Sequence, residues 1–239
     1  MPELDTGGID AAALAAAITD ATPYPPFPEG LDLERATELQ AQVVAILSPN
    51  GPGGLKAGVT VEAAQAALGV PGPLLGHLHE GRGLESGCAL PADEGVKIEC
   101  EVGVRIGADG TIRGIRPVIE LARLDWASPS DFSGPNLLAT NIAADRYIVG
   151  AETPWSGDPT DGIVATRSGE VFVESTASFS LGGPTAAVAW LLEEAPRRGF
   201  EIPDDVLFIT GACGAVESLT GGDYVVDYGP LGTVEFTAS

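Results

Sequence analysis

Two glutamates, Glu99 and Glu101, are neighbours on one face of the segment "KIECEVGVRI" (97–106). Apolar residues alternate with polar ones here, which predicts a β-strand with one core face and one face that carries both carboxylates. Residues two apart on a strand lie roughly 7 Å apart, so the two like charges repel each other. The pair is compatible with a solvated outer face, or with a divalent metal site in which the cation converts repulsion into attraction.

A third acid, Glu120, favours the metal site. It lies between Ile119 and Leu121 in "IRPVIELARLDW" (115–126), a segment otherwise typical of a buried strand. A charge in such a segment is costly unless it is paired or bound to a metal. Carboxylate oxygens are hard ligands, so we expect Glu99, Glu101 and Glu120 to hold Mg²⁺ or Mn²⁺. Because the three acids repel, removing any one of them is expected to leave the metal-free protein at least as stable.

Lys56 is one of only two lysines in the chain, and it lies among glycines in "GPGGLKAGVT" (51–60). Glycines allow a backbone and a ligand to approach closely. One interpretation is an ordinary surface lysine. The other is a lysine beside the metal that binds a substrate carboxylate or transfers a proton.

Length and charge restrict the classes of protein and partner. A chain of 239 residues suits one β-rich domain, or such a domain with a small helical extension. The formal net charge of −22 opposes binding to nucleic acid or to an anionic membrane surface. The N-terminus has no signal-peptide pattern, no apolar run is long enough to span a bilayer, and the three cysteines form no CxxC pair. We therefore expect a cytoplasmic protein without a membrane or nucleic-acid partner.

The elements that position these residues change in type along the chain. Helical periodicity, capping residues and glycine stops predict helices over 10–21, 32–48 and 61–68, the last capped by Thr60. From about residue 95 the pattern predicts strands, interrupted by one helix over 184–195; the strands are 97–106, 112–121, 147–151, 163–166, 170–178, 206–210, 223–228 and 232–237. We expect a helical N-terminal cap over 1–70 and a β-rich, metal-binding catalytic domain over 71–239.

Seven segments, in their order along the chain, resemble a known family. They are "GGLKAGVT", "IECEVGVRIG", "PVIELARLDW", "NLLATNIAADRYIVG", "LGGPTAAVAWL", "IPDDVLFITGACGAV" and "LTGGDYVVDYGPLGTVEF". The series is similar to the 2-keto-4-pentenoate hydratase and 4-oxalocrotonate decarboxylase branch of the fumarylacetoacetate hydrolase superfamily, over nearly the whole chain. The resemblance implies an α+β fold, a mixed β-roll with a helical N-terminal cap. It matches Glu99, Glu101 and Glu120 to the family's metal carboxylates, and Lys56 to its motif lysine.

The resemblance also implies an activity. It implies a divalent-metal-dependent lyase, either a hydratase or a decarboxylase, that acts on a short unsaturated 2-oxo or 2-hydroxy-dienoic acid, as in aromatic meta-cleavage catabolism. The metal would act as a Lewis acid, Lys56 would move protons, and Leu55, Lys56 and Thr210 would contact the substrate. The family further implies a homo-oligomer. Two alternatives stay open: a hydrolase that cleaves C–C bonds of acylpyruvates at the same metal site, and a non-catalytic member that kept the fold.

Two segments depart from the family pattern. In "GHLHEGRGLESG" (76–87) the family's catalytic acid is missing, and Glu80 is the best substitute. His79 is expected to act there as a general acid or base or to contact the substrate. His77 and His79 could instead bind zinc or lie in a surface loop. The second departure is "TGACGAV" (210–216), which leaves the substrate preference open.

Overall fold

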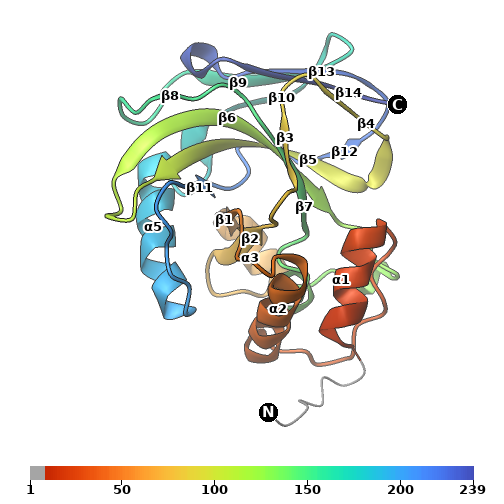
Figure 1. The fold of residues 1–239 in the computed structure, drawn as a ribbon. Helices are drawn as coiled ribbons and strands as arrows, with labels where there is room; N and C mark the ends of the chain where they lie inside the picture. Colours follow the sequence, from red (N-terminus) through yellow and green to blue (C-terminus); the bar gives the residue numbers. More distant parts are fainter. Residues whose placement is uncertain (1–8) are drawn as a thin grey trace.

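A computed structural model describes residues 9–239, and in that range the chain forms five α-helices and fourteen β-strands (Figure 1). The helices are α1 (Ala11–Asp20), α2 (Leu33–Leu47), α3 (Glu62–Leu68), α4 (Gly134–Ala139) and α5 (Pro184–Arg197). The four predicted helices are therefore confirmed. The short helix α4 was not predicted, because six residues are too few to display a helical period.

Side-chain caps explain where the first two helices begin. Asp10 accepts a hydrogen bond from the Ala13 N–H at 2.6 Å, and Asp32 accepts one from the Arg35 N–H at 2.9 Å. The prediction that Thr60 caps the third helix is wrong. The N-cap position of α3 is Val61, which makes no side-chain cap hydrogen bond, and the helix ends at Gly69 in the left-handed region, with a φ of 69°.

The strands form two sheets, a large sheet of nine and a smaller one of five. The large sheet has the order β2-β1-β11-β5-β6-β7-β3, with β12 paired to β5 and β8 paired to β6; the smaller has the order β10-β9-β13-β14-β4. The strands are β1 (Gly54–Gly58), β2 (Leu74–Leu78), β3 (Gly83–Glu85), β4 (Cys88–Leu90), β5 (Asp93–Ile106), β6 (Ile112–Arg123), β7 (Ala144–Val149), β8 (Thr153–Pro154), β9 (Gly162–Arg167), β10 (Glu170–Thr176), β11 (Val206–Ile209), β12 (Glu217–Leu219), β13 (Gly222–Asp227) and β14 (Thr233–Ala238).

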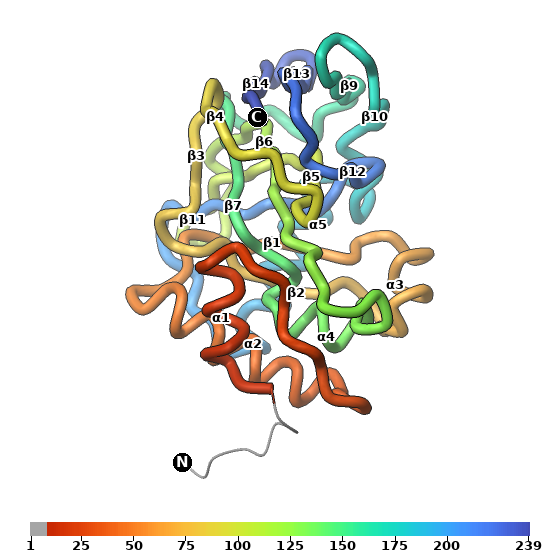
Figure 2. The backbone as a smooth tube through the Cα atoms, turned by 90° about the vertical axis from the view of Figure 1, so that its right-hand side faces the viewer, coloured from red at the N-terminus to blue at the C-terminus, as the bar shows by residue number. Residues whose placement is uncertain are grey.

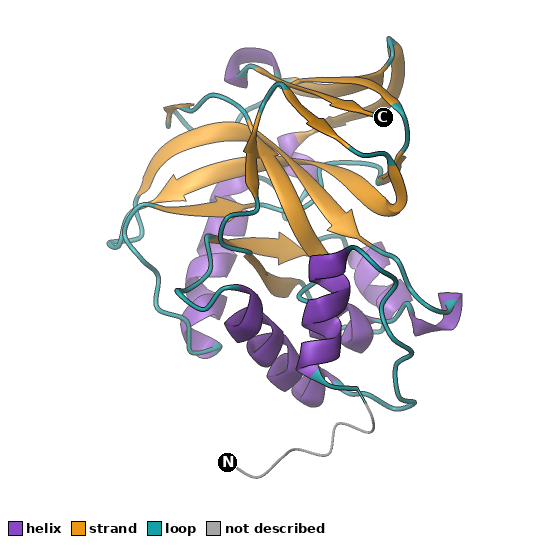
Figure 3. Cartoon of the chain, turned by 45° about the vertical axis from the view of Figure 1, so that its right-hand side comes forward, coloured by secondary structure: helices purple, strands orange, loops and turns teal. Residues whose placement is uncertain are grey.

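Parallel and antiparallel pairs occur together in the large sheet, since β1 runs parallel to β11 and antiparallel to β2. Both sheets curl, with the smaller sheet stacked on one side of the large one and helices α1 to α4 grouped on the other (Figures 2 and 3). The expected α+β fold, a mixed β-roll with a helical N-terminal cap, is confirmed. No helix in the described part of the chain is long and apolar enough to cross a membrane.

The strand β1 differs from the expectation of a mainly helical segment before residue 70. The sequence predicted no strand over these residues, whereas β1 pairs with β2 and β11 inside the large sheet. Five residues between glycines carry too weak a period to predict a strand, and the partner β11 begins only at Val206. The division into a cap (1–70) and a catalytic domain (71–239) stays a proposal.

The described residues form four apolar clusters, and the three larger ones fill the space between these layers. One lies between the two sheets and includes Ile98, Cys100, Ile119 and Leu121. A second joins helices α1, α2 and α4, and a third packs α5 against the large sheet. Since side chains alternate along a strand, Glu99, Glu101 and Glu120 face away from the smaller sheet, toward β1 and the helical side. The fold thus places the three acids on an inner face.

Candidate active site and metal centre

The three predicted acids lie together. Glu99 on β5 is directly opposite Glu120 on β6 in the antiparallel register, and Glu101 is two residues further along β5. One carboxylate oxygen from each of the three lies within 4.8 Å of the others. Glu101 and Glu120 are fully buried, with 0% and 1% of their surface exposed, and Glu99 is half-buried. Within residues 9–239 this is the one group of three or more acidic, histidine or cysteine side chains close enough to share a metal ion.

The donor set fits a divalent cation. Glu101 Oε2 accepts a hydrogen bond from the Gly211 N–H at 2.7 Å, whereas Glu101 Oε1 and Glu120 Oε2 are buried and find no donor in the described part of the chain. Burial, together with the charge of Glu120, raises the pKa of Glu99 to about 7 and raises that of Glu101 well above its usual value. Unpaired carboxylate oxygens, held this close, are the hard ligands that Mg²⁺ and Mn²⁺ require.

Lys56 is buried beside the acids, with 2% of its surface exposed. Its Nζ forms an ion pair with Glu120 Oε1 and donates a hydrogen bond to the Ile142 carbonyl at 3.0 Å. Burial disfavours the ammonium, but attraction to Glu120, Glu99 and Glu101 outweighs it, so the pKa of Lys56 is raised. Of the two interpretations, that of an ordinary surface lysine is wrong.

A glycine on the next strand makes room for this lysine. Gly76 of β2 is the register partner of Lys56, and a Cβ there would lie 2.7 Å from Lys56 Cγ. Only a residue without a side chain allows the alkyl chain of Lys56 to pass at that distance. Gly76 therefore directs Lys56 toward Glu120.

A left-handed turn, which the sequence did not indicate, holds the other partner of Lys56. Asn141, Ile142 and Ala143 have φ angles of 59°, 54° and 55°. Asn141 fixes this turn to β2, because its Oδ1 accepts from the His77 N–H at 2.9 Å and its Nδ2 donates to the His77 carbonyl at 2.8 Å. Asparagine tolerates the left-handed region, which is the one local signal for this role, whereas Ile142 is strained there.

Both histidines are buried, with 0% of His77 and 2% of His79 exposed, so the alternative of a surface loop is wrong. His77 is part of β2, and its ring lies 4.1 Å from that of Phe200. His79 Nε2 lies 3.2 Å from Asn141 Nδ2, which donates to it. Burial lowers the pKa of both histidines to about 4, so each is neutral at pH 7. Neither belongs to a metal-binding group in the described part of the chain, which leaves the zinc alternative without support.

The other predicted site residues are not gathered around the acids. Glu80 is exposed and accepts a hydrogen bond from Asn50 at 3.2 Å. Leu55 packs in the core beneath α5, on the opposite face of β1 from Lys56. Thr210 is fully buried and immediately precedes Gly211, which binds Glu101. The roles of Glu80, His79, Leu55 and Thr210 stay predictions, because none of these residues lines the pocket described next.

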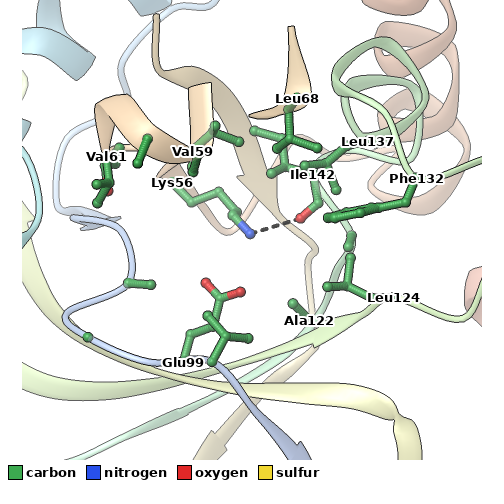
Figure 4. Close-up of a pocket in the computed structure, with 18 of the residues that line it drawn as sticks. Lys56, Val59, Val61, Leu68, Glu99, Ala122, Leu124, Phe132, Leu137 and Ile142 are labelled. Carbon is green, nitrogen blue, oxygen red and sulfur yellow. Dashed lines mark hydrogen bonds between the residues drawn. The ribbon is translucent and has the colours of Figure 1, made fainter. Parts of the chain in front are cut away.

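A pocket of about 430 Å³ opens above the site. Lys56 and Glu99 form its floor, as Figure 4 shows, and most of its wall consists of aliphatic and aromatic side chains. A charged floor under an apolar wall is typical of a small-molecule site in which few polar groups fix the orientation of the ligand.

We expect Glu120→Gln to destabilise the metal-free protein by about 3 kcal/mol, because the buried Lys56 loses its ion-pair partner. This corrects the expectation that all three acids are equivalent. Glu99→Gln is the matched control. It removes a repelling carboxylate that forms no ion pair with Lys56, so the stability of this variant should equal or exceed that of the wild type. Urea unfolding in EDTA measures both values, and an equal loss in the two variants would contradict the assignment.

Acid should weaken the fold through the histidines. Their folded pKa of about 4 is below the ordinary 6.5, so the unfolded chain binds more protons between these values and stability falls as the pH falls. Between pH 7 and pH 5, one such histidine accounts for about 2 kcal/mol. His79→Gln should therefore lose less stability than the wild type over this range in chemical denaturation. The raised pKa values of the glutamates change the stability of the fold in the opposite direction. Because both proteins contain the same glutamates, this effect cancels in the comparison. Parallel pH curves for the two proteins would refute the prediction.

The chain is similar in sequence to decarboxylases and hydratases. It is 29% identical over 198 residues to a 4-oxalocrotonate decarboxylase of Pseudomonas putida, covering 76% of this chain and 75% of that protein. It is 26% identical over 187 residues to a 2-keto-4-pentenoate hydratase of Paraburkholderia xenovorans, covering 71% and 69%. A search against models of protein families found no match.

Solved structures show the same fold. A 4-oxalocrotonate decarboxylase from Pseudomonas putida, complexed with magnesium and adipate, superimposes with a TM-score of 0.82 at 23% identity, covering 96% of this chain and 97% of that one. A fumarylpyruvate hydrolase from Pseudomonas aeruginosa, in complex with Mn²⁺ and pyruvate, gives 0.55 at 17% identity, covering 77% and 88%. These comparisons confirm the expected resemblance to the 2-keto-4-pentenoate hydratase and 4-oxalocrotonate decarboxylase branch of the fumarylacetoacetate hydrolase superfamily.

Proposed function

We propose that the protein is a divalent-metal-dependent lyase that acts on a short unsaturated 2-oxo or 2-hydroxy-dienoic acid, by water addition or by loss of CO₂. Glu99, Glu101 and Glu120 would hold Mg²⁺ or Mn²⁺. The observation that carries the proposal is the buried group of three carboxylates and one lysine, of which Glu99 and Lys56 form the floor of an apolar pocket. A merely structural ion pair between Lys56 and Glu120 would not need two further acids beside it, nor would it leave buried oxygens of Glu101 and Glu120 without a donor.

A bound divalent cation would supply Lewis acidity toward the C2 oxygen of the substrate. The chain itself would supply the proton transfers. A lysine ammonium has three N–H donors, and Lys56 directs one to Glu120 and one to the Ile142 carbonyl. The third N–H is left for the substrate, so Nζ can deliver a proton to it and recover one through Glu120.

The surrounding residues hold these groups in place. The Gly211 N–H fixes one oxygen of Glu101, and the Asn141 turn fixes the carbonyl that orients Lys56. The apolar wall limits the access of bulk water, which strengthens the electrostatic interactions at the floor. The remaining alternative within the superfamily, a C–C bond hydrolase, would need a base to activate water. No histidine is among the described residues that line the pocket, and Glu80 is exposed, so nothing in the site favours a hydrolase.

Turnover tests the proposal directly. Incubation with Mg²⁺ or Mn²⁺ and either 2-hydroxypenta-2,4-dienoate or 2-oxo-3-hexenedioate should remove the ultraviolet absorbance of at least one of them. Lys56→Met should slow that loss by at least about a hundredfold, the usual minimum for a group that transfers protons. Lys97→Met is the matched control, since the other lysine hydrogen-bonds Ser218 at 2.6 Å and lies outside the pocket lining. An unchanged absorbance of both substrates would overturn the lyase assignment.

Metal binding should stabilise the fold. A ligand that binds only the folded state raises the unfolding free energy by mass action, by about 2.7 kcal/mol at a hundredfold excess over its dissociation constant. Thermal melts of the wild type should therefore shift upward on adding Mn²⁺ after EDTA treatment, whereas Glu101→Gln should shift much less. Glu80→Gln serves as control, because it removes an exposed carboxylate outside the pocket. If Glu101→Gln responds to Mn²⁺ like the wild type, the three acids are not the metal site.

We also propose that the enzyme works as a homo-oligomer in the cytoplasm, with a small 2-oxo acid as its ligand. The support for an oligomer is the family resemblance, together with exposed apolar side chains on the smaller sheet, Val171 and Val225. Light scattering at moderate salt should give a mass that is a multiple of 24.3 kDa. A monomer mass at working concentration would contradict this part of the proposal.

A further inference from the structure

The pocket above the metal centre differs sharply between its floor and its wall. The floor carries the charges of Lys56 and Glu99, while the wall is apolar except for Thr60. A 2-oxo acid bound through its head group at the floor would place the rest of its carbon chain, its tail, against this wall (Figure 4). The wall therefore decides which tails are accepted.

The wall offers no partner for a charged tail. Lys56 is the one cation among the described residues that line the pocket, and its Nζ is already paired with Glu120. A second carboxylate at the end of the tail would lose its hydration without gaining a partner, and burying a charge in this way is costly. The decarboxylase of similar fold was crystallised with adipate, a dicarboxylate. The wall of this chain is not built for such a ligand.

Lys97 is the next cation that could pair with the second carboxylate of a dicarboxylate ligand. It lines a neighbouring groove, which shares Leu124 and Phe132 with the pocket. However, its Nζ donates to Ser218 Oγ at 2.6 Å and to the Glu94 carbonyl at 3.1 Å, so two of its three donors are taken. Lys97 is thus held outside the pocket by its own partners.

Several apolar side chains at the rim of the pocket are exposed to solvent. Six large apolar residues in the described part of the chain are exposed, and three of them line this pocket: Phe132, Phe179 and Val216, at 45%, 50% and 43% exposure. They come from separate segments, before α4, at the end of a short helical turn, and before β12. Exposed apolar groups that gather around a cavity mark a binding site. An apolar tail reaching the rim would cover them.

The volume fits such a tail. About 430 Å³ is within the range of pockets that enclose ligands larger than a five-carbon acid, roughly 300–1,000 Å³. Resting on the proposed function, we infer that the pocket selects monocarboxylic 2-oxo or 2-hydroxy-dienoic acids whose tail is uncharged, apolar and longer than a vinyl group. This selection favours water addition over decarboxylation of a dicarboxylate such as 2-oxo-3-hexenedioate.

Binding of stable 2-oxo acids tests the inference without turnover. In calorimetry with Mn²⁺ present, affinity should rise about fourfold for each methylene from 2-oxobutanoate to 2-oxohexanoate, the value of one buried CH₂. 2-Oxohexanedioate, which has the same number of carbons as 2-oxohexanoate, should bind at least tenfold more weakly. Equal or tighter binding of the diacid, or no dependence on length, would overturn the inference. If the diacid binds more tightly than the monoacid and Lys97→Met removes this preference, the second carboxylate pairs with Lys97 instead of being rejected.

A charge placed in the wall should reverse the preference. Phe132→Arg and Phe179→Arg each put a cation on the exposed rim, so either should shift the ratio of diacid to monoacid affinity by at least tenfold toward the diacid. Ile46→Arg is the control, an exposed apolar residue on α2 outside the pocket, and its ratio should stay that of the wild type. An unchanged ratio in both rim variants, with a normal Mn²⁺ melting shift, would also overturn the inference. Failure of turnover with every dienoate would instead remove the proposed function, while the binding ratios remain measurable.

Discussion

Three carboxylates inside the protein are the constraint on which the rest of this structure depends. Burial and mutual repulsion both oppose their ionisation, and the chain provides one opposing charge, the ammonium of Lys56. Three negative charges and one positive charge leave a formal charge of −2 when all four groups are ionised. A divalent cation would neutralise that remainder, which is why we propose a metal centre here rather than a structural salt bridge.

The fold supplies this cluster from distant segments. The antiparallel pair β5–β6 sets Glu99 opposite Glu120, and β11 carries β1, with Lys56, alongside β5. The turn at Asn141 then provides the carbonyl that holds the ammonium. A strained, left-handed conformation at Ile142 persists because the neighbouring Asn141 is hydrogen-bonded to β2 and Ile142 itself packs in the apolar cluster of α1, α2 and α4. Rigid strands thus hold the charged groups, and a strained turn completes their environment.

The site separates chemistry from selectivity. The floor residues Lys56 and Glu99, with Glu101 and Glu120 buried beside them, are the groups that would bind the metal and move a proton. The wall contains almost no polar group and comes from α3, the end of β6 and the segments around Phe132, Phe179 and Val216. Differences between substrates are therefore expected to depend on the wall, because an apolar surface distinguishes a charged tail from an uncharged one through desolvation.

The sequence by itself determined four of the five helices in residues 9–239, the long strands and the face that carries Glu99 and Glu101, because periods of 3.6 and 2 are local properties of the chain. It also singled out Glu120, since an acid inside an apolar strand is conspicuous. Only the tertiary structure decided that Lys56 pairs with Glu120, that Asn141 orients that pair, that both histidines are buried, and that Glu80 stays outside. These contacts join residues more than 60 positions apart, and β1 is too short to show a period. Their geometry arises from sheet pairing, which no local pattern encodes.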